Sequence, residues 1–309
     1  MRRRLIQLLI ATGAVLLICV IGVLGLLWAR PFEVSQWYNR SALESAGFDR
    51  QLHDHDHGHI TFFEAGTGPP LVFVHGLSDQ AGSWHEVAAE FDEFKVIVVD
   101  LPDHGKSPVH DDAIDAATGL DVVFEFLDGF ADDEPLTLVG NSLGGWISME
   151  YALSRPNRVQ HLVAIGSAGL HHQVDASLVN PTNRDEARQM VHAIFGDDAP
   201  DFPGFILDRL IESGEDDGSA DSIWSRRERV DYLDDRIHQL HVPTDLVWGT
   251  EDRIMPMELG HRFHDKLPNS TLHSLDGCGH VPQLGCPDEL VHKLRQVLTV
   301  QPTAPSSDS

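Results

Sequence analysis

The chain has 309 residues, of which 42% are hydrophobic, enough for one large domain with a substantial core. It carries 48 acidic residues against 22 lysines and arginines, a formal net charge of −26 at pH 7 that argues against nucleic acid as a partner. Its three cysteines are too few for a disulfide framework.

Residues 1–30 are predicted to form a membrane anchor. Residues 5–29 contain no charged side chain, and as a helix they would exceed the ~30 Å of a hydrocarbon core. Arg2, Arg3 and Arg4 precede this run, which indicates a cytoplasmic N-terminus and an extracytoplasmic domain, periplasmic if the source is bacterial. A cleaved signal peptide is the alternative, but its apolar region would be shorter. We therefore expect an uncleaved, single-pass anchor.

Residues 31–57 are predicted to be a juxtamembrane segment. Trp28, Trp37 and Tyr38 are aromatic residues of the kind that lie at a membrane interface, and a short helix is expected over residues 32–50.

Four histidines alternate along residues 53–59, and aligned imidazoles of this kind can bind zinc or copper. The intervening acidic residues and Gly58 are better explained by a surface turn that leads into an antiparallel edge strand over residues 59–64. We therefore expect no bound metal and no cofactor.

The chain from residue 58 onwards alternates short apolar runs with helix-like stretches. The apolar runs cover residues 71–75, 95–100, 136–140, 158–166, 244–249 and 271–275. The helix-like stretches cover residues 82–91, 113–130, 143–155, 257–267 and 287–299. Uniformly apolar runs indicate strands buried on both faces, so this alternation predicts an α/β fold with a mostly parallel, doubly wound sheet.

The alternation of strands and helices stops between residues 168 and 240. Amphipathic pieces at 184–195, 203–213 and 226–240 predict an inserted helical cap there. The core is accordingly expected in two parts, residues 58–167 and 241–299. The polar tail at 300–309 is expected to be disordered.

The most informative motif is Gly140-Asn-Ser142-Leu-Gly144, which lies between a predicted strand and a predicted helix. A sharp strand-to-helix turn of this kind exposes the hydroxyl of its central serine above the sheet. The serine also begins a helix, where backbone N–H groups can stabilise an oxyanion. Ser142 is therefore the candidate nucleophile, and the backbone N–H groups of Leu77 and Leu143 are the candidate oxyanion hole.

A serine needs a base, and the base needs a carboxylate to orient it. His280 and Asp252 follow the last two predicted strands, and ligands collect at the carboxyl ends of strands in a parallel sheet. The chain order Ser142, Asp252, His280 suits this fold. Glu251 is the rival acid, and His75 is expected to be structural rather than a base. Cys278 and Cys286 flank His280 and could pair in an oxidising compartment, but small packing residues are the favoured interpretation.

Together these motifs resemble the α/β-hydrolase superfamily over residues 58–299. The landmarks are His75-Gly76, Asp100-Leu-Pro-Asp-His-Gly-Lys-Ser107, Gly140–Gly144, Gly249–Asp252 and Gly279-His280. With the anchor, Ser167–Leu170 and Asn180–Ala187, the chain looks most similar to membrane-anchored monoacylglycerol lipases and related bacterial lipase-esterases. One departure is Asp103, where the family usually has glycine; aspartate tolerates a left-handed backbone better than most residues.

The resemblance implies a membrane-anchored serine hydrolase that cleaves small-molecule or lipid carboxylic esters through an acyl-enzyme on Ser142. A carbon–carbon bond hydrolase using the same triad is the alternative, because members of that group resemble the Asn-Ser-x-Gly-Gly turn. A non-catalytic binding protein on the same fold is the remote alternative. Epoxide hydrolases and haloalkane dehalogenases are disfavoured, since that resemblance would require aspartate at position 142.

Overall fold

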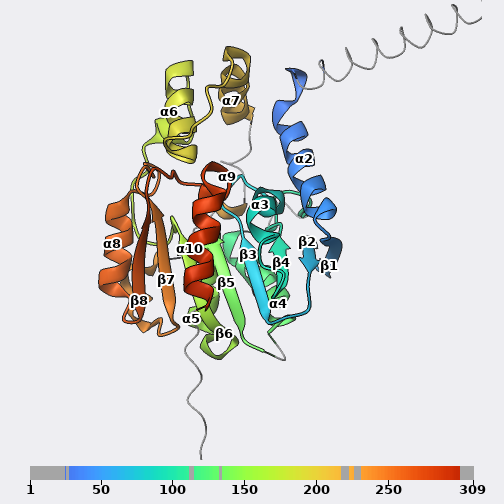
Figure 1. Cartoon of the computed structure of the whole chain (residues 1–309), viewed down its shortest axis with the longest axis vertical. Coiled ribbons are helices and arrows are strands. Elements are labelled where there is room, and N and C mark those ends of the chain that lie inside the picture. Colours follow the sequence, from blue (N-terminus) through green and yellow to red (C-terminus); the bar gives the residue numbers. More distant parts are fainter. Residues whose placement is uncertain are drawn as a thin grey trace, which may run out of the picture.

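An eight-stranded sheet forms the centre of the molecule (Figure 1). The computed structural model describes residues 25, 28–110, 115–131, 134–216, 223–225 and 231–299. The strands are β1 (Asp49–His55), β2 (Gly58–Ala65), β3 (Pro70–Val74), β4 (Lys95–Val99), β5 (Leu136–Asn141), β6 (Val159–Ile165), β7 (Thr244–Gly249) and β8 (Ser270–Leu275). They lie in the order β1-β2-β4-β3-β5-β6-β7-β8. The β1–β2 and β2–β4 pairs are antiparallel and all others are parallel, which confirms the predicted mostly parallel sheet.

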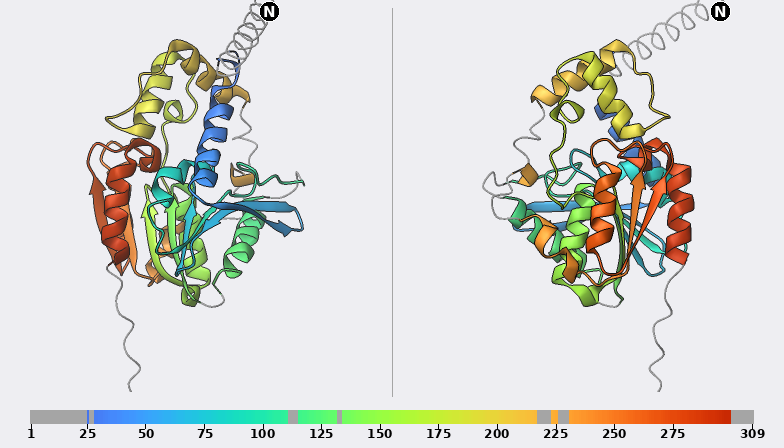
Figure 2. Two further views of the ribbon diagram at one scale, coloured as in Figure 1. Left: turned by 45° about the vertical axis from the view of Figure 1, so that its right-hand side comes forward. Right: turned by 90° about the vertical axis from the view of Figure 1, so that its left-hand side faces the viewer.

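Helices cover both faces of the sheet. The α-helices are α2 (Pro31–Ser45), α3 (His85–Ala88), α4 (Ala116–Asp128), α5 (Leu143–Ser154), α6 (Arg184–Phe195), α7 (Gly204–Asp216), α8 (Met257–Lys266), α9 (Pro282–Gly285) and α10 (Pro287–Thr299). One layer contains α2, α3 and α10, and the opposite layer contains α4, α5 and α8 (Figure 2). Successive strand residues point to opposite faces, so Val72 and Val74 pack with the second layer, and Leu71 and Phe73 with the first. The fully buried β3 and β5 therefore match the uniformly apolar runs from which they were predicted.

The two edge strands of the sheet are β1 and β8, and β1 was not predicted from the sequence. The predicted edge strand at 59–64 is β2, the second strand in the order, and residues 49–55 belong to the sheet rather than to a juxtamembrane segment. Most of β1 is exposed, so it carries no apolar pattern. The expected helix over residues 32–50 ends earlier, at Ser45, and Gly47 with φ 95° turns the chain into the strand.

The alternating histidines lie on and beside this β1–β2 hairpin. The ring of His53 packs edge-on against Phe126 with centroids 5.6 Å apart. Within the described residues, no group of three or more His, Cys, Asp or Glu side chains is arranged to hold a metal ion.

An excursion between β6 and β7 places α6 and α7 above the carboxyl ends of the strands (Figures 1 and 2). The Asn183 side chain caps α6, accepting hydrogen bonds from the N–H groups of Asp185 and Glu186, both at 3.0 Å. These are the first two helices predicted for the cap.

The third predicted cap helix, at 226–240, is wrong where the structure describes it. Residues 226–230 lie outside the described part, and residues 231–240 contain two short 3₁₀ turns. The Leu233 N–H donates to Gly169 O at 2.7 Å, and the Arg236 guanidinium pairs with the buried Glu150 of α5. These contacts fasten the segment to the core and override its helical pattern.

The predicted anchor and tail fall largely outside the described residues, which begin at residue 25 and end at residue 299. None of the helices described is long and apolar enough to cross a membrane. The anchor therefore stays a prediction.

Candidate active site

Ser142 lies on the sharp turn between β5 and α5. Its backbone is in the left-handed region, with φ 53° and ψ −114°, which is rare for a residue other than glycine. A Cβ on Gly140 would lie 2.4 Å from Gly144 O, and one on Gly144 would lie 2.2 Å from Val74 O. Both positions therefore require glycine, and the strained backbone is held in place by this tight packing.

Asp252 and His280 form a buried hydrogen-bonded pair at the ends of β7 and β8. The Asp252 Oδ2 and His280 Nδ1 atoms are 2.8 Å apart, and the two side chains are 0% and 8% exposed. Asp252 Oδ1 also accepts hydrogen bonds from the N–H groups of Ile254 and Met255, at 3.0 and 2.8 Å. These contacts assign the proton of a neutral His280 to Nδ1 and leave Nε2 to take a proton. The rival acid, Glu251, has its Oε2 atom 3.5 Å from the Arg253 guanidinium. The carboxylate that contacts His280 is therefore that of Asp252.

The nucleophile turn and the His280 loop are held together by Asn141, which precedes Ser142. Its side-chain Nδ2 donates to His280 O at 2.9 Å and to Ile165 O at 3.1 Å, and the Ser142 N–H also donates to Ile165 O at 2.9 Å.

A Cβ on Gly166 would lie 2.9 Å from Asp252 Oδ2 and 3.2 Å from His280 Nδ1. The structure thus gathers the three predicted residues at one edge of the sheet. The contacts of Asn141 and Gly166 were not predicted from the sequence, although a glycine directly after a buried strand is a usable signal of close approach.

Of the two predicted oxyanion donors, Leu143 directly follows Ser142 and Leu77 directly follows Gly76, which packs against Ser142. Leu143 is the first residue of α5, and its N–H belongs to the unpaired first turn of that helix. A Cβ on Gly76 would lie 3.2 Å from Ser142 Cβ, so the turn that carries Leu77 packs directly against the nucleophile. The following residue, Ser78, has φ 59°, and its N–H donates to His104 Nε2 at 3.0 Å.

His75 is a structural residue, as predicted. It is fully buried; its Nδ1 donates to Gly76 O at 2.7 Å, and its Nε2 accepts from the Leu101 N–H at 3.0 Å. Burial, with a smaller contribution from His104, lowers the pKa of His75 to about 3. The ring therefore stays neutral and braces the oxyanion turn against the strand that ends at Val99.

Asp103 has the left-handed backbone expected of it, with φ 66°. The loop around it is organised by the buried Asp100, whose carboxylate accepts hydrogen bonds from the N–H groups of Ala81 at 2.6 Å and Lys106 at 2.8 Å. Desolvation raises the pKa of Asp100. Asp103 therefore adopts the left-handed backbone for which glycine is usual at this position.

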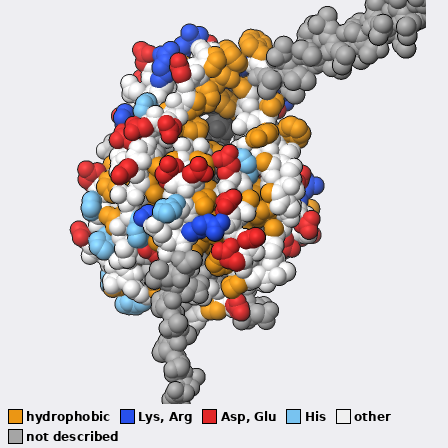
Figure 3. All heavy atoms as spheres, in the orientation of Figure 1, with side chains coloured by type: hydrophobic (Ala, Val, Ile, Leu, Met, Phe, Trp, Pro, Cys, Tyr) orange, Lys and Arg blue, Asp and Glu red, His pale blue; other side chains and the backbone are white. Residues whose placement is uncertain are grey.

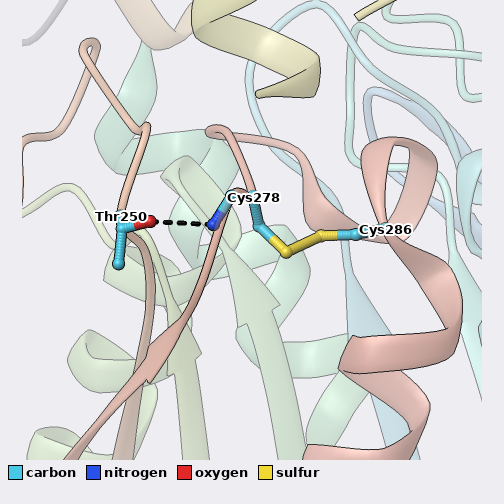
Figure 4. Close-up of a disulfide and its surroundings, with 4 residues drawn as sticks. Thr250, Cys278 and Cys286 are labelled. Atoms are coloured by element: carbon cyan, nitrogen blue, oxygen red, sulfur yellow. Dashed lines mark hydrogen bonds between the residues drawn. A yellow bond between two sulfur atoms is a disulfide. The ribbon is translucent and has the colours of Figure 1, made fainter. Parts of the chain in front are cut away.

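Cys278 and Cys286 form a disulfide, so their interpretation as unpaired packing residues is wrong (Figure 4). Their Cα atoms are 6.0 Å apart, a separation that the sequence alone could not supply. The His280 loop is also bonded to the cap: the N–H groups of His280 and Val281 donate to Ala193 O and Ile194 O of α6, at 2.9 and 3.0 Å. The candidate base therefore lies within the segment that the disulfide closes, and its backbone is bonded to the end of α6.

Removing the disulfide should weaken both the fold and the site. The bond closes a loop with a sequence separation of 8, and loop-closure entropy predicts a loss of about 2–3 kcal/mol in the free energy of unfolding for Cys278→Ser/Cys286→Ser. Urea unfolding with and without reductant measures this loss. Cys19→Ser is the control for thiol chemistry elsewhere in the chain; a double-serine variant as stable as the wild type would contradict the prediction.

A strained serine on a strand-to-helix turn and a histidine–carboxylate pair on later strand ends, all on a mostly parallel sheet, form the arrangement expected of a hydrolase. Residues 71–293 match the model of the Alpha/beta hydrolase family, and the chain belongs to this family.

Among similar proteins is the 2-hydroxy-6-oxo-6-(2'-aminophenyl)hexa-2,4-dienoic acid hydrolase of Metapseudomonas resinovorans, 26% identical over 75% of this chain and 84% of the relative. A bacterial membrane phospholipase A superposes with a TM-score of 0.75 at 24% identity, covering 98% of this chain and 100% of its own. Naproxen esterase of Bacillus subtilis superposes with a TM-score of 0.69 at 15% identity, covering 86% and 97%. At these identities the two structural matches show a shared fold.

Proposed function

We propose that the protein is a membrane-anchored serine hydrolase of carboxylic esters. The observation that carries this proposal is the strained Ser142 beside the buried Asp252–His280 pair. Esterases and a phospholipase among the proteins that share its fold support an ester as substrate.

In the proposed mechanism, Ser142 Oγ attacks the ester carbonyl carbon while His280 Nε2 accepts the hydroxyl proton. The negative oxygen of the tetrahedral intermediate accepts hydrogen bonds from the N–H groups of Leu77 and Leu143. His280 then protonates the leaving alcohol, and an acyl-enzyme remains on Ser142. A water molecule, deprotonated by His280, attacks the acyl carbon and releases the carboxylic acid. Asp252 orients the imidazole and stabilises its charged form throughout.

Membrane attachment is supported by apolar residues near the N-terminal end of the described chain. Trp28, Trp37 and Tyr38 are 59%, 64% and 62% exposed, and Phe205 of α7 is 39% exposed. Hydrophobic side chains gather over α7 and α2 at the top of the face in Figure 3. The Arg209 guanidinium of α7 also lies 5.5 Å from the centroid of the Trp28 ring. Aromatic side chains of this kind suit the level of lipid headgroups.

An extracytoplasmic position for the domain is supported by the disulfide, because such bonds persist in oxidising compartments. Accessibility of residue Lys293 to a membrane-impermeant amine reagent in intact cells tests this orientation. Labelling before lysis is the expected result, and labelling only after lysis would place the domain in the cytoplasm.

A carbon–carbon bond hydrolase is the second candidate. The dienoic acid hydrolase similar to this chain supports it, as does the Asn-Ser-x-Gly-Gly turn. A non-catalytic binding protein is a third candidate; it predicts that a fluorophosphonate leaves Ser142 of the folded protein unlabelled.

A series of p-nitrophenyl esters separates these candidates. We expect hydrolysis by the wild type, with a preference for long acyl chains if the protein is a lipase and for acetate if it is an esterase. A 2-hydroxy-6-oxo-dienoate is assayed in parallel. Cleavage of that compound with no turnover of any ester would reverse the ranking in favour of the carbon–carbon hydrolase.

A further inference from the structure

Gln283 is a fully buried amide at the start of α9, three residues after His280, and the mechanism above gives it no role. Its Nε2 donates to Asn141 Oδ1 at 3.1 Å and lies 3.5 Å from Asp79 Oδ2. These three residues come from the three separate segments that carry the candidate machinery. Asp79 is two residues after Leu77, Asn141 directly precedes Ser142, and Gln283 follows His280.

The orientation of each amide is determined by its neighbours. Asn141 Nδ2 faces the carbonyl oxygens of His280 and Ile165, so Asn141 must present Oδ1 to Gln283. Gln283 must then present Nε2, and its Oε1 is buried without a hydrogen-bond partner. Reversing Gln283 would place its Oε1 against Asn141 Oδ1. Reversing Asn141 would place its Oδ1 against the carbonyl oxygens of His280 and Ile165. A buried amide oxygen without a hydrogen bond lowers the stability of the fold, so packing alone is a poor explanation for Gln283 at this position.

Asp79 ends this chain of contacts with a carboxylate. It is partly exposed, and its Oδ2 accepts a hydrogen bond from Ser83 Oγ at 2.8 Å. Desolvation raises its pKa from 3.8 to about 6, and the nearby Asp100 adds to the rise; hydrogen bonds from Ser83, from the Gln80 backbone and from Gln283 oppose it. At neutral pH the turn therefore carries a carboxylate that reduces the stability of the fold.

We infer that Gln283 is a positioning residue that, with Asp79 and Asn141, holds the oxyanion turn, Ser142 and the His280 loop at a fixed spacing. The inference rests on the proposed function, because that function requires these three segments to act on one substrate. A displacement of about 1 Å in such an arrangement costs roughly 100-fold in rate. The contacts touch none of the reacting atoms, so their loss should appear in kcat rather than in KM.

The test compares Gln283→Met, Asp79→Asn and the double variant with the wild type. Methionine keeps the length of the side chain and removes the hydrogen bonds. We expect Gln283→Met to lower kcat roughly 100-fold with KM little changed, and to slow fluorophosphonate labelling of Ser142 by a similar factor. The double variant should lose no more than the worse single variant, because the substitutions interrupt one network. The inference would be overturned if the loss of kcat in the double variant equalled the product of the two single losses. A kcat of Gln283→Met equal to that of the wild type would also overturn it.

A matched control is Gln160→Met, since Gln160 on β6 also donates from Nε2, to Thr137 Oγ1 at 3.3 Å, away from the candidate site. It should leave kcat and the labelling rate unchanged; a loss equal to that of Gln283→Met would assign the effect to packing and overturn the inference.

Asp79→Asn supplies a variant that should not fail by unfolding. A carboxyl whose pKa is raised by folding stabilises the protein below about pH 4 and loses that contribution as the pH rises through about 6. Asp79→Asn should therefore have a higher Tm than the wild type at pH 8 and no such gain at pH 4, while its kcat falls. A stabilised variant with full activity would overturn the inference.

Labelling also separates the inference from the proposed function. A wild type that is labelled at Ser142 but hydrolyses no ester refutes the proposed substrate and leaves the labelling rates as the test of Gln283. A wild type that is neither labelled nor active refutes both. A labelled, active wild type matched by Gln283→Met refutes the inference alone.

Discussion

Ser142→Ala is expected to lower kcat about 10⁶-fold while the protein remains folded. Alanine removes only the hydroxyl and fits the same strained backbone, so KM and the unfolding midpoint should change little. The residual rate would come from substrate binding and the oxyanion donors alone. Ester hydrolysis and circular dichroism on the same preparation measure both quantities.

Ser154→Ala is the matched control, because Ser154 is exposed at the end of the helix that Ser142 begins. It should retain full activity. His280→Ala should lose about as much as Ser142→Ala, and Asp252→Asn about 10⁴-fold, since an amide at 252 would favour the wrong imidazole tautomer. Substantial turnover by Ser142→Ala would refute the proposed mechanism.

Gly144→Ala is expected to destabilise the fold by about 3 kcal/mol or more and to abolish activity. The new Cβ would lie 2.2 Å from Val74 O and 2.6 Å from His75 O. Both atoms are backbone: Val74 ends a central strand and His75 is fully buried, so neither can yield as a flexible side chain would. The alternative is to displace α5 and with it Ser142.

Gly129→Ala is the control for this substitution. Gly129 ends α4 with φ −65°, and the nearest described atom to its added Cβ, outside its two chain neighbours, would be Phe126 O at 3.4 Å. Alanine there should be neutral or slightly stabilising, by less than about 1 kcal/mol. Urea unfolding compares the variants; equal midpoints for Gly144→Ala and the wild type would show that the turn can relax.

The parts of the fold that could be predicted are those with a local signal. Strands buried on both faces have uniformly apolar sequences, and Gly140 and Gly144 mark a turn that needs glycine, so β5, its turn and α5 followed directly. Ser142, Asp252 and His280 were placed at strand ends because each follows a predicted strand, and their chain order suits the fold. Their roles stay predictions, while the structure adds the 2.8 Å contact between Asp252 and His280.

The features that could not be predicted depend on contacts between distant segments. β1 is exposed along most of its length, so only pairing with β2 identifies it as a strand. The Cys278–Cys286 bond depends on how the chain around His280 folds back on α10. Gln283 is meaningful only when Asn141 and Asp79 are seen beside it, although they are 142 and 204 residues away in the chain.

The contacts between α6 and the His280 loop limit how the cap can be exchanged between enzymes. Ala193 and Ile194 belong to the cap, yet their carbonyl groups hold the backbone of the candidate base, and a Cβ on Gly279 would lie 2.5 Å from Ile194 O. In a chimera with a cap from another enzyme, these two carbonyl groups would be replaced or displaced. Such a chimera would gain a new specificity but would lose the correct position of His280. Recombination points for directed evolution should therefore leave residues 192–196 with the core and vary the cap on either side of them.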